Sequence, residues 1–201
     1  MSDALKVLAS ALDFAAGLDD PNARRILSYV PSPPFTPRAL APRLYPVTEF
    51  VPAARAGAAP AATVLIDALI AAAPKLHWWQ SYVATDFSDT FLTRYGFVEL
   101  LGTRGQFVCD GVAIGITMLG SNIEYPAHHH VAEELYIPIS GTADWMRDNG
   151  PYTLRLPGAV IHHPSQMHHA MRTNTEPLLA LYIWRGGDLA QKSDIPARVN
   201  D

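Results

Sequence analysis

The sequence has little of several features that mark common protein classes. Cys109 is the single cysteine among 201 residues, which excludes an intrachain disulfide and any zinc or redox centre built on a Cys-x-x-Cys pair. Charged residues make up 17% of the chain and the formal net charge is -4, so the basic surface that binds nucleic acid or anionic membranes is missing. We therefore expect a small-molecule partner, and neither nucleic acid nor a membrane.

Long hydrophobic runs are missing as well. No stretch approaches the roughly 20 apolar residues of a membrane-spanning helix, and the N-terminal residues lack the basic segment and apolar core of a secretory signal. We therefore expect a cytoplasmic protein, either a monomer or a homodimer. With 49% hydrophobic residues, the chain is long enough to bury a core as one domain, or as one domain with an appendage.

The sequence pattern changes near residue 97. Before it, apolar residues at helical spacing predict helices over residues 4–16 and 61–73, joined through the proline- and alanine-rich stretch 31–60. After it, short apolar runs separated by turn residues predict an antiparallel barrel or sandwich. We therefore divide the chain into a helical and proline-rich extension, residues 1–96, that packs on a β-barrel, residues 97–201, which holds the functional site.

Histidine is concentrated in the second part. Seven of the eight histidines lie between residues 128 and 169, and His128, His130 and Glu134 follow a His-x-His-x-x-x-Glu spacing. Imidazole and carboxylate groups are ligands of divalent transition metals. Because strand side chains alternate between faces, these three residues and Tyr136 are expected to share one face. The sequence therefore predicts a metal site with a tyrosine beside it.

A last ligand is expected from the second histidine cluster. His168 and His169 follow another predicted strand, and either one would complete a site that leaves one position for water or substrate. We assign His129, His162 and His163 to the surface or to positions that support the ligands.

These residues resemble the two motifs of the cupin superfamily, small double-stranded β-barrels that hold a metal on two His, one Glu and a final His. The first motif covers residues 128–134 with Gly141, and the second runs from Leu156-Pro157-Gly158 to Asn174. Two departures occur: Gly120 precedes the first motif by more residues than usual, and Gln166 stands where the second motif commonly has Gly. The general cupin pattern favours His169 as the final ligand, whereas the subfamily described next favours His168.

The stretch from Tyr125 to Tyr136, on a chain of this size with a helical and proline-rich N-terminal part, resembles the bacterial cupin-type dimethylsulfoniopropionate (DMSP) lyases. Those enzymes split DMSP into dimethyl sulfide and acrylate. The resemblance implies a mainly β cupin double-stranded barrel with an N-terminal helical extension, and no organic cofactor. It also implies one divalent transition metal ion (Zn, Fe, Mn, Co or Ni), held by His128, His130, Glu134 and His168.

The implied reaction is a β-elimination. A base removes the proton α to the carboxylate while the sulfonium leaves from the β-carbon, and a metal that binds the carboxylate lowers the barrier as a Lewis acid. The leaving group is already cationic and needs no general acid. Tyr136 is the candidate base, because a nearby cation favours its phenolate. Tyr125 would orient the substrate or assist proton transfer.

Two other functions fit the same residues. An iron-dependent cupin dioxygenase acting on a small carboxylate would use the same ligand set, and a non-catalytic small-molecule-binding cupin is the third candidate. The N-terminal extension either caps the barrel mouth or only packs on the barrel. Aromatic faces bind sulfonium cations, but the sequence does not rank the candidates, which are Trp78, Trp79, Tyr82, Tyr95, Trp145, Tyr182 and Trp184.

Overall fold

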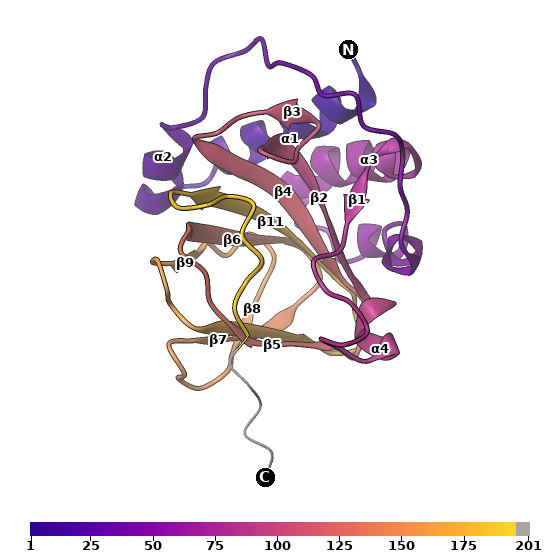
Figure 1. Ribbon diagram of the computed structural model, residues 1–201, viewed down its shortest axis with the longest axis vertical. Coiled ribbons are helices and arrows are strands. Elements are labelled where there is room, and N and C mark those ends of the chain that lie inside the picture. The colour runs from indigo at the N-terminus through magenta and orange to yellow at the C-terminus, as the bar shows by residue number, and fades with distance from the viewer. Residues whose placement is uncertain (196–201) are drawn as a thin grey trace.

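The computed structural model describes residues 1–195 and places a helical layer on two facing antiparallel sheets (Figure 1). Its α-helices are α1 (Asp3–Ala16), α2 (Pro21–Leu27), α3 (Thr63–Ala72) and α4 (Asp89–Leu92). Within the same residues, short 3-10 helices accompany them: η1 (Pro46–Phe50), η2 (Ala53–Arg55), η3 (Pro60–Ala62) and η4 (Ala73–Lys75). No helix in this part of the chain is both long and apolar enough to cross a bilayer.

The strands form two sheets. The larger sheet has the order β1-β2-β4-β11-β6-β9, with β3 paired to β2, and the smaller has the order β5-β10-β7-β8. Their bounds are β1 (Trp78–Trp79), β2 (Tyr95–Gly102), β3 (Phe107–Val108), β4 (Val112–Leu119), β5 (Glu124–His128), β6 (Glu133–Ser140), β7 (Ala143–Arg147), β8 (Thr153–Arg155), β9 (Ile161–His163), β10 (His169–Thr173) and β11 (Leu178–Arg185).

This arrangement confirms the fold class that the sequence predicted, a mainly β cupin barrel preceded by helices. The barrel is open, since its strands are paired within two separate sheets. Strand β1 comes from the first 96 residues and pairs with β2. The larger sheet therefore contains residues from both sides of the boundary expected at residue 97.

The N-terminal helices begin where side chains can cap them. The Ser2 hydroxyl accepts a hydrogen bond from the Leu5 backbone N–H at 3.2 Å, which satisfies one free donor at the start of α1. The Asp20 carboxylate does the same for α2, where Pro21 occupies the first turn. The helices expected over 4–16 and 61–73 are present as α1 and α3, whereas α2 was not predicted.

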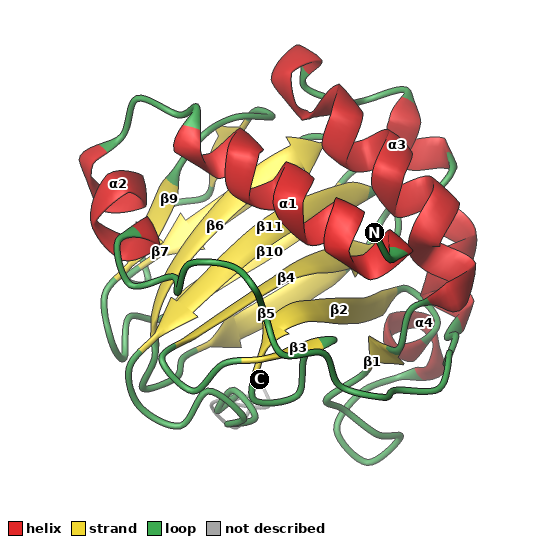
Figure 2. Ribbon diagram, turned by 90° about the horizontal axis from the view of Figure 1, so that it is seen from above, coloured by secondary structure: helices red, strands yellow, loops and turns green. Residues whose placement is uncertain are grey.

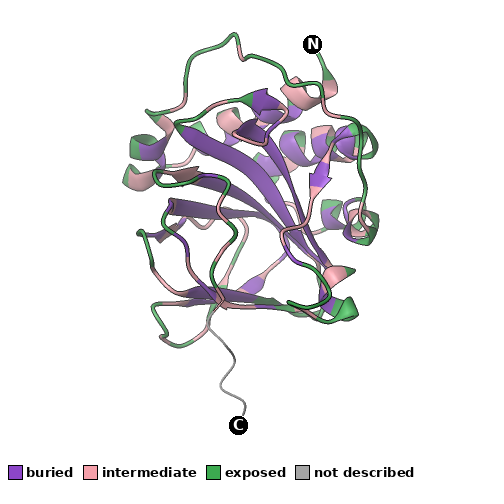
Figure 3. Cartoon of the chain, viewed as in Figure 1, coloured by how far each residue is buried: buried purple, intermediate pink, exposed green. Residues whose placement is uncertain are grey.

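The larger sheet has two buried faces with different partners. Viewed from above, α1 and α3 lie across its outer face (Figure 2), where Leu135 and Ile137 of β6 belong to the same apolar core as Leu8 and Leu65. Because side chains alternate along a strand, Tyr136 points the other way, into a second core between the two sheets. Burial on both faces makes β2 and β4 buried along their whole length (Figure 3).

The helical layer should contribute strongly to stability. Leu65 of α3 is 1% exposed within the outer core, whereas its neighbour Val64 is 70% exposed. Leu65→Ala removes buried methyl groups and leaves a cavity, so we expect it to lower the free energy of unfolding by about 2–5 kcal/mol. Val64→Ala should change it by about 0.5 kcal/mol or less. Urea unfolding followed by circular dichroism measures both, and equal effects would show that α3 does not depend on this packing.

Candidate active site

The candidate site lies where the two sheets face each other. Glu134 of β6 projects from the inner face of the larger sheet, and its register partners are Trp184 of β11 and His163 of β9. His128 and His169 pair across β5 and β10 of the smaller sheet. His130 follows in the turn between β5 and β6. The β-pairing therefore brings together side chains that are up to 56 positions apart in the sequence, from His128 to Trp184.

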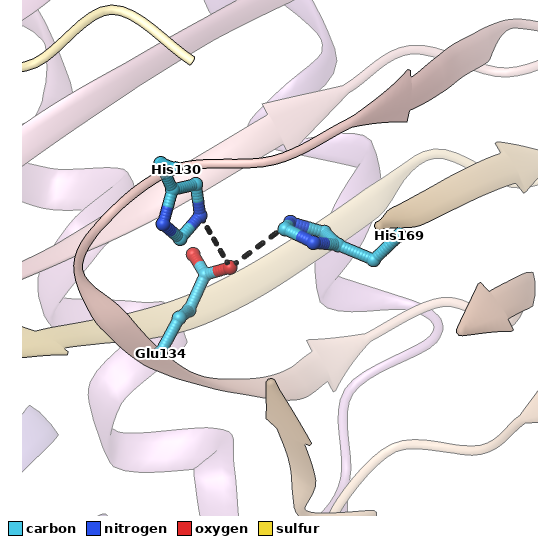
Figure 4. A group of neighbouring side chains, drawn as sticks. All are labelled: His130, Glu134 and His169. Atoms are coloured by element: carbon cyan, nitrogen blue, oxygen red, sulfur yellow. Dashed lines mark hydrogen bonds and ion pairs between the residues drawn. The ribbon is translucent and has the colours of Figure 1, made fainter. Parts of the chain in front are cut away.

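Three of these residues form a compact, buried triad (Figure 4). The Nε2 atoms of His130 and His169 each lie 3.2 Å from Oε2 of Glu134. The potential ligand atoms of the triad all lie within 4.8 Å of one another. Although burial alone would raise the pKa of Glu134, its contacts with the surrounding imidazoles hold that pKa well below its usual range. Glu134 is therefore a carboxylate.

Backbone carbonyls set the orientation of the histidine rings. Nδ1 of His130 donates to the Ala132 carbonyl at 2.8 Å, and Nδ1 of His169 donates to the Met167 carbonyl at 2.9 Å. A carbonyl can only accept, so Nδ1 carries a proton in both rings, and Nε2 carries a lone pair in the singly protonated form that binds a metal. Two lone pairs and a carboxylate oxygen thus face one another in a buried space, and His169 Nε2 has no hydrogen-bond partner within residues 1–195. This donor set fits a bound cation.

His128 lies beside the triad. Its ring centroid is 4.1 Å from that of His169, and its Nδ1 donates to the Pro126 carbonyl at 2.8 Å. Burial lowers the pKa of His128 well below its usual value, so the ring stays neutral and keeps a lone pair on Nε2. His128 can therefore extend the donor set.

His168 lies outside this group. It is half-buried, and its ring packs against that of His129 with the centroids 4.5 Å apart. The physical reason is the register: β10 begins at His169, which pairs with His128, so the preceding residue points away from the site. The structure therefore groups His169, the alternative that the general cupin pattern favoured, with His130 and Glu134, and it places His168 apart from them.

His163 and Trp184 support Glu134. The indole N–H of Trp145 donates to His163 Nε2 at 3.2 Å, which leaves His163 Nδ1 as the donor to Glu134 Oε2 at 3.2 Å. Trp184 Nε1 donates to Oε1 of the same carboxylate at 2.5 Å. Burial lowers the pKa of His163 to about 3, so this ring is a neutral donor. Each residue donates a hydrogen bond to one carboxylate oxygen, and together they hold the carboxylate in place.

Both predicted catalytic tyrosines are buried next to the histidines. The Tyr136 ring lies 6.4 Å from that of His169, and its hydroxyl is 3.4 Å from Thr117 Oγ1. Tyr125 stacks on His128 with ring centroids 3.9 Å apart, and its hydroxyl is hydrogen-bonded to that of Tyr82 at 2.6 Å. Burial raises the pKa of both Tyr125 and Tyr136 well above the usual value.

A small pocket lies beside the triad. Its lining includes His128, Tyr125 and Tyr136, together with Glu99 and Tyr182 from the inner face of the larger sheet. Residues 189–193, which follow β11, complete part of the wall. The pocket therefore joins several aromatic side chains to His128 and Trp184, which lie directly beside the triad.

Glu99 is a pocket residue that sequence reasoning missed. It is fully buried in β2, and its Oε1 accepts the backbone N–H of Arg104 at 2.7 Å. Burial raises its pKa although Arg104 opposes the shift. The alternation of side chains along the strand could have identified it, because Tyr95, Phe97 and Glu99 share the inner face. Glu99 is also the one charged residue of this strand.

An open cupin barrel with a buried His/Glu triad and an adjoining aromatic pocket defines a protein that acts on a small molecule. A sequence model of the dimethylsulfoniopropionate lyase family matches residues 22–180. The chain therefore belongs to the DMSP lyase family.

Individual relatives agree with this assignment. The DMSP lyase DddQ of Ruegeria pomeroyi is 34% identical over 120 residues, which are 60% of each chain. The putative DMSP lyase DddL of Cereibacter sphaeroides is 27% identical over 123 residues, which are 60% of this chain and 50% of that one. The matched segments thus span between half and two thirds of these curated relatives.

Solved structures match over nearly the whole chain. The crystal structure of DMSP lyase DddQ from Ruegeria pomeroyi has a TM-score of 0.85 and 27% identity, and covers 99% of this chain and 98% of that one. A chain from the crystal structures of the DMSP lyases RdDddP and RnDddQII has a TM-score of 0.86 and 30% identity, and covers 96% and 97%.

The buried Glu99 should make stability depend on pH in a defined direction. Its pKa in the folded protein is raised above the unfolded value of 4.5, so its stabilising contribution is present below that value and is lost as the pH rises through the folded pKa. Glu99→Gln removes this titration. We therefore expect the free energy of unfolding of the variant, relative to that of the wild type, to increase as the pH rises from the unfolded value of 4.5 through the folded pKa of Glu99.

Urea unfolding at several pH values measures this difference. Glu49→Gln changes the same charge at an exposed position of η1 and serves as the control. A Glu99→Gln curve that runs parallel to the wild-type curve across the whole range would contradict the expected shift.

Proposed function

We propose that this protein is a metal-dependent lyase that cleaves DMSP to dimethyl sulfide and acrylate by β-elimination, with Tyr136 as the base. Membership of the DMSP lyase family supports the reaction. The observation that carries the proposal is the convergence of Tyr136 and the lone pairs of the histidine cluster on one buried space. A base and a cation site are the two parts that this elimination requires.

The donor set supports a divalent transition metal at the triad. His130, Glu134 and His169 would hold it, with His128 as a fourth donor, since imidazole and carboxylate suit Zn, Fe, Mn, Co or Ni. When bound, such an ion would supply Lewis-acid stabilisation of the negative charge that develops on the substrate carboxylate. The hydrogen bonds from His163 and Trp184 hold the Glu134 ligand in place.

Tyr136 takes the α-proton in the proposed reaction. Burial and the nearby Glu134 carboxylate raise its pKa, so the phenolate forms near neutral pH only where a cation lies close. Once formed, it accepts the proton from the α-carbon. The C–H electron pair becomes the double bond of acrylate, and the C–S electron pair leaves with neutral dimethyl sulfide.

Two neighbouring hydroxyl groups assist Tyr136. Thr117 Oγ1 lies 3.4 Å from the Tyr136 hydroxyl and can donate to the phenolate, which positions the base. Tyr125 is fixed between the His128 ring and the Tyr82 hydroxyl, so its phenol presents a preorganised group to the pocket. Both interactions keep the reacting atoms away from bulk water.

Removing the Tyr136 hydroxyl should abolish most of the activity. Tyr136→Phe keeps the ring but loses the base, so we expect release of dimethyl sulfide to fall by about 100-fold to 10,000-fold. Headspace gas chromatography with purified protein and DMSP measures this loss.

The matched control is Tyr29→Phe, which removes the same atom from an exposed tyrosine and should leave the rate unchanged. No dimethyl sulfide from the metal-loaded wild type would overturn the lyase function. Full activity in Tyr136→Phe would overturn only the assignment of the base.

The two neighbouring histidines should differ in metal binding. His169→Ala removes a buried donor of the triad and should lower the metal-to-protein ratio by at least about tenfold after dialysis, whereas His168→Ala should retain the metal. Inductively coupled plasma mass spectrometry measures this ratio without reference to activity. Metal loss in His168→Ala and retention in His169→Ala would reverse the ligand assignment.

A further inference from the structure

One row of residues crosses the inner face of the larger sheet. Glu99, Gly115, Tyr182 and Tyr136 are successive register partners on β2, β4, β11 and β6, strands that lie side by side (Figures 1 and 2). Three inter-strand spacings separate the Cα atoms of Glu99 and Tyr136 by about 14 Å. Both side chains line the pocket, so a buried carboxylate marks the end of the row opposite the proposed base.

Tyr182 leans toward the Glu99 end of this row. A Cβ atom at Gly115 would lie 2.5 Å from Cζ and from the hydroxyl oxygen of Tyr182, so only glycine leaves room for the ring there. Tyr182 is 6% exposed, and its hydroxyl has no hydrogen-bond partner among the described residues. A buried hydroxyl without a partner is unfavourable, which indicates that a ligand completes this part of the pocket.

Glu99 and Arg104 form an ion pair in the pocket wall. Glu99 is fully buried, whereas the side chain of Arg104 is 25% exposed and its Nε lies 3.4 Å from Oε2 of Glu99. The Arg104 Nη1 reaches the Ala190 carbonyl at 3.5 Å, in the segment that follows β11. Both Glu99 and Arg104 line the pocket, but the carboxylate is fully buried and the guanidinium is partly exposed, so the anionic group is the more deeply placed of the two.

Most other aromatic candidates for a cation site use their polar atoms elsewhere, including Tyr95, which is hydrogen-bonded to Ser81 and Tyr125, whereas Trp79 does not line the pocket. Trp145 and Trp184 donate their indole N–H groups to His163 and Glu134, and the Tyr82 hydroxyl is paired with Tyr125. Trp78 lies in the core under the helices. Tyr182 is therefore the candidate with a free polar atom in the pocket, and it stands next to the anionic end.

We propose that Glu99, with the phenol oxygen and ring of Tyr182, forms the subsite for the cationic end of the substrate. The inference rests on the proposed function, since it assigns one end of the pocket to the onium group of a small zwitterion whose carboxylate lies at the triad. Two methylene groups separate the charges in DMSP, so the substrate spans the row with its α-carbon at the Tyr136 end. Opposite charge and an aromatic face both favour an onium cation.

Two non-sulfonium ligands test the charge preference directly. 3-(Trimethylammonio)propionate carries a carboxylate and an onium cation, whereas 4-methylpentanoate carries the same carboxylate on a neutral tail, in which C–H replaces the sulfonium sulfur of DMSP. Calorimetry on the metal-loaded wild type should show tighter binding of the cationic ligand, and this preference should grow as the pH rises and Glu99 ionises.

Glu99→Gln should weaken the binding of the cationic ligand by about tenfold or more, because a full charge at close range is lost. The binding of 4-methylpentanoate should stay unchanged within about twofold. With DMSP the same variant should show a raised KM and a nearly unchanged kcat. Equal weakening of both ligands, or of neither, would overturn the subsite.

Control variants distinguish the loss of the subsite from misfolding and from the loss of lyase activity. The amide introduced by Glu99→Gln keeps a carbonyl oxygen that can accept the Arg104 N–H. Tyr182→Phe removes only the unpaired hydroxyl and should also weaken the cationic ligand selectively, whereas Glu49→Gln should have no effect. A wild type that releases dimethyl sulfide but shows no charge preference would refute the subsite alone. A wild type that prefers the cation but releases no dimethyl sulfide would refute the lyase function and retain the subsite.

Discussion

The structure depends on a group of hydrogen-bond acceptors that lie close together in the buried interior. Backbone carbonyls hold the Nδ1 protons of His130 and His169, so their Nε2 lone pairs face the carboxylate of Glu134 at 3.2 Å. Acceptors packed against one another without solvent are unfavourable unless a cation joins them. The surrounding sheets must therefore be stable enough to hold this arrangement in place, and the donors from His163 and Trp184 fix the carboxylate.

The helical layer provides that stability. Strands β2, β4, β6 and β11 bury apolar side chains against α1 and α3 on the outer face, so the inner face can carry polar and titratable groups. On β6 this division is visible residue by residue, since Leu135 and Ile137 face the helices while Glu134 and Tyr136 face the pocket. Helices α1 and α3 therefore lie behind the site, whereas Ser81 and Tyr95 at the end of the N-terminal extension line the pocket together with Leu189, Gln191 and Ser193.

Sequence patterns predicted the parts of the site that depend on one strand. Parity placed Glu134 and Tyr136 on a common face, and the structure shows both on the inner face of β6. The choice between His168 and His169 depended on where β10 begins and on its register with β5, which contains an irregularity after His169. Local sequence does not encode such a register, because it is set by pairing between distant segments.

Glu99 was missed for a related reason. A single acid in the apolar run from Tyr95 to Gly102 has no motif around it, and its importance appears only when Gly115, Tyr182 and Tyr136 are aligned across three other strands. In the proposed function, this alignment places the onium group near the buried Glu99 carboxylate and the substrate carboxylate toward the triad. A zwitterion that entered in the reverse direction would place like charges together at both ends, and the sulfonium would lie at the base. The polarity of the row therefore selects the one orientation in which Tyr136 meets the α-carbon.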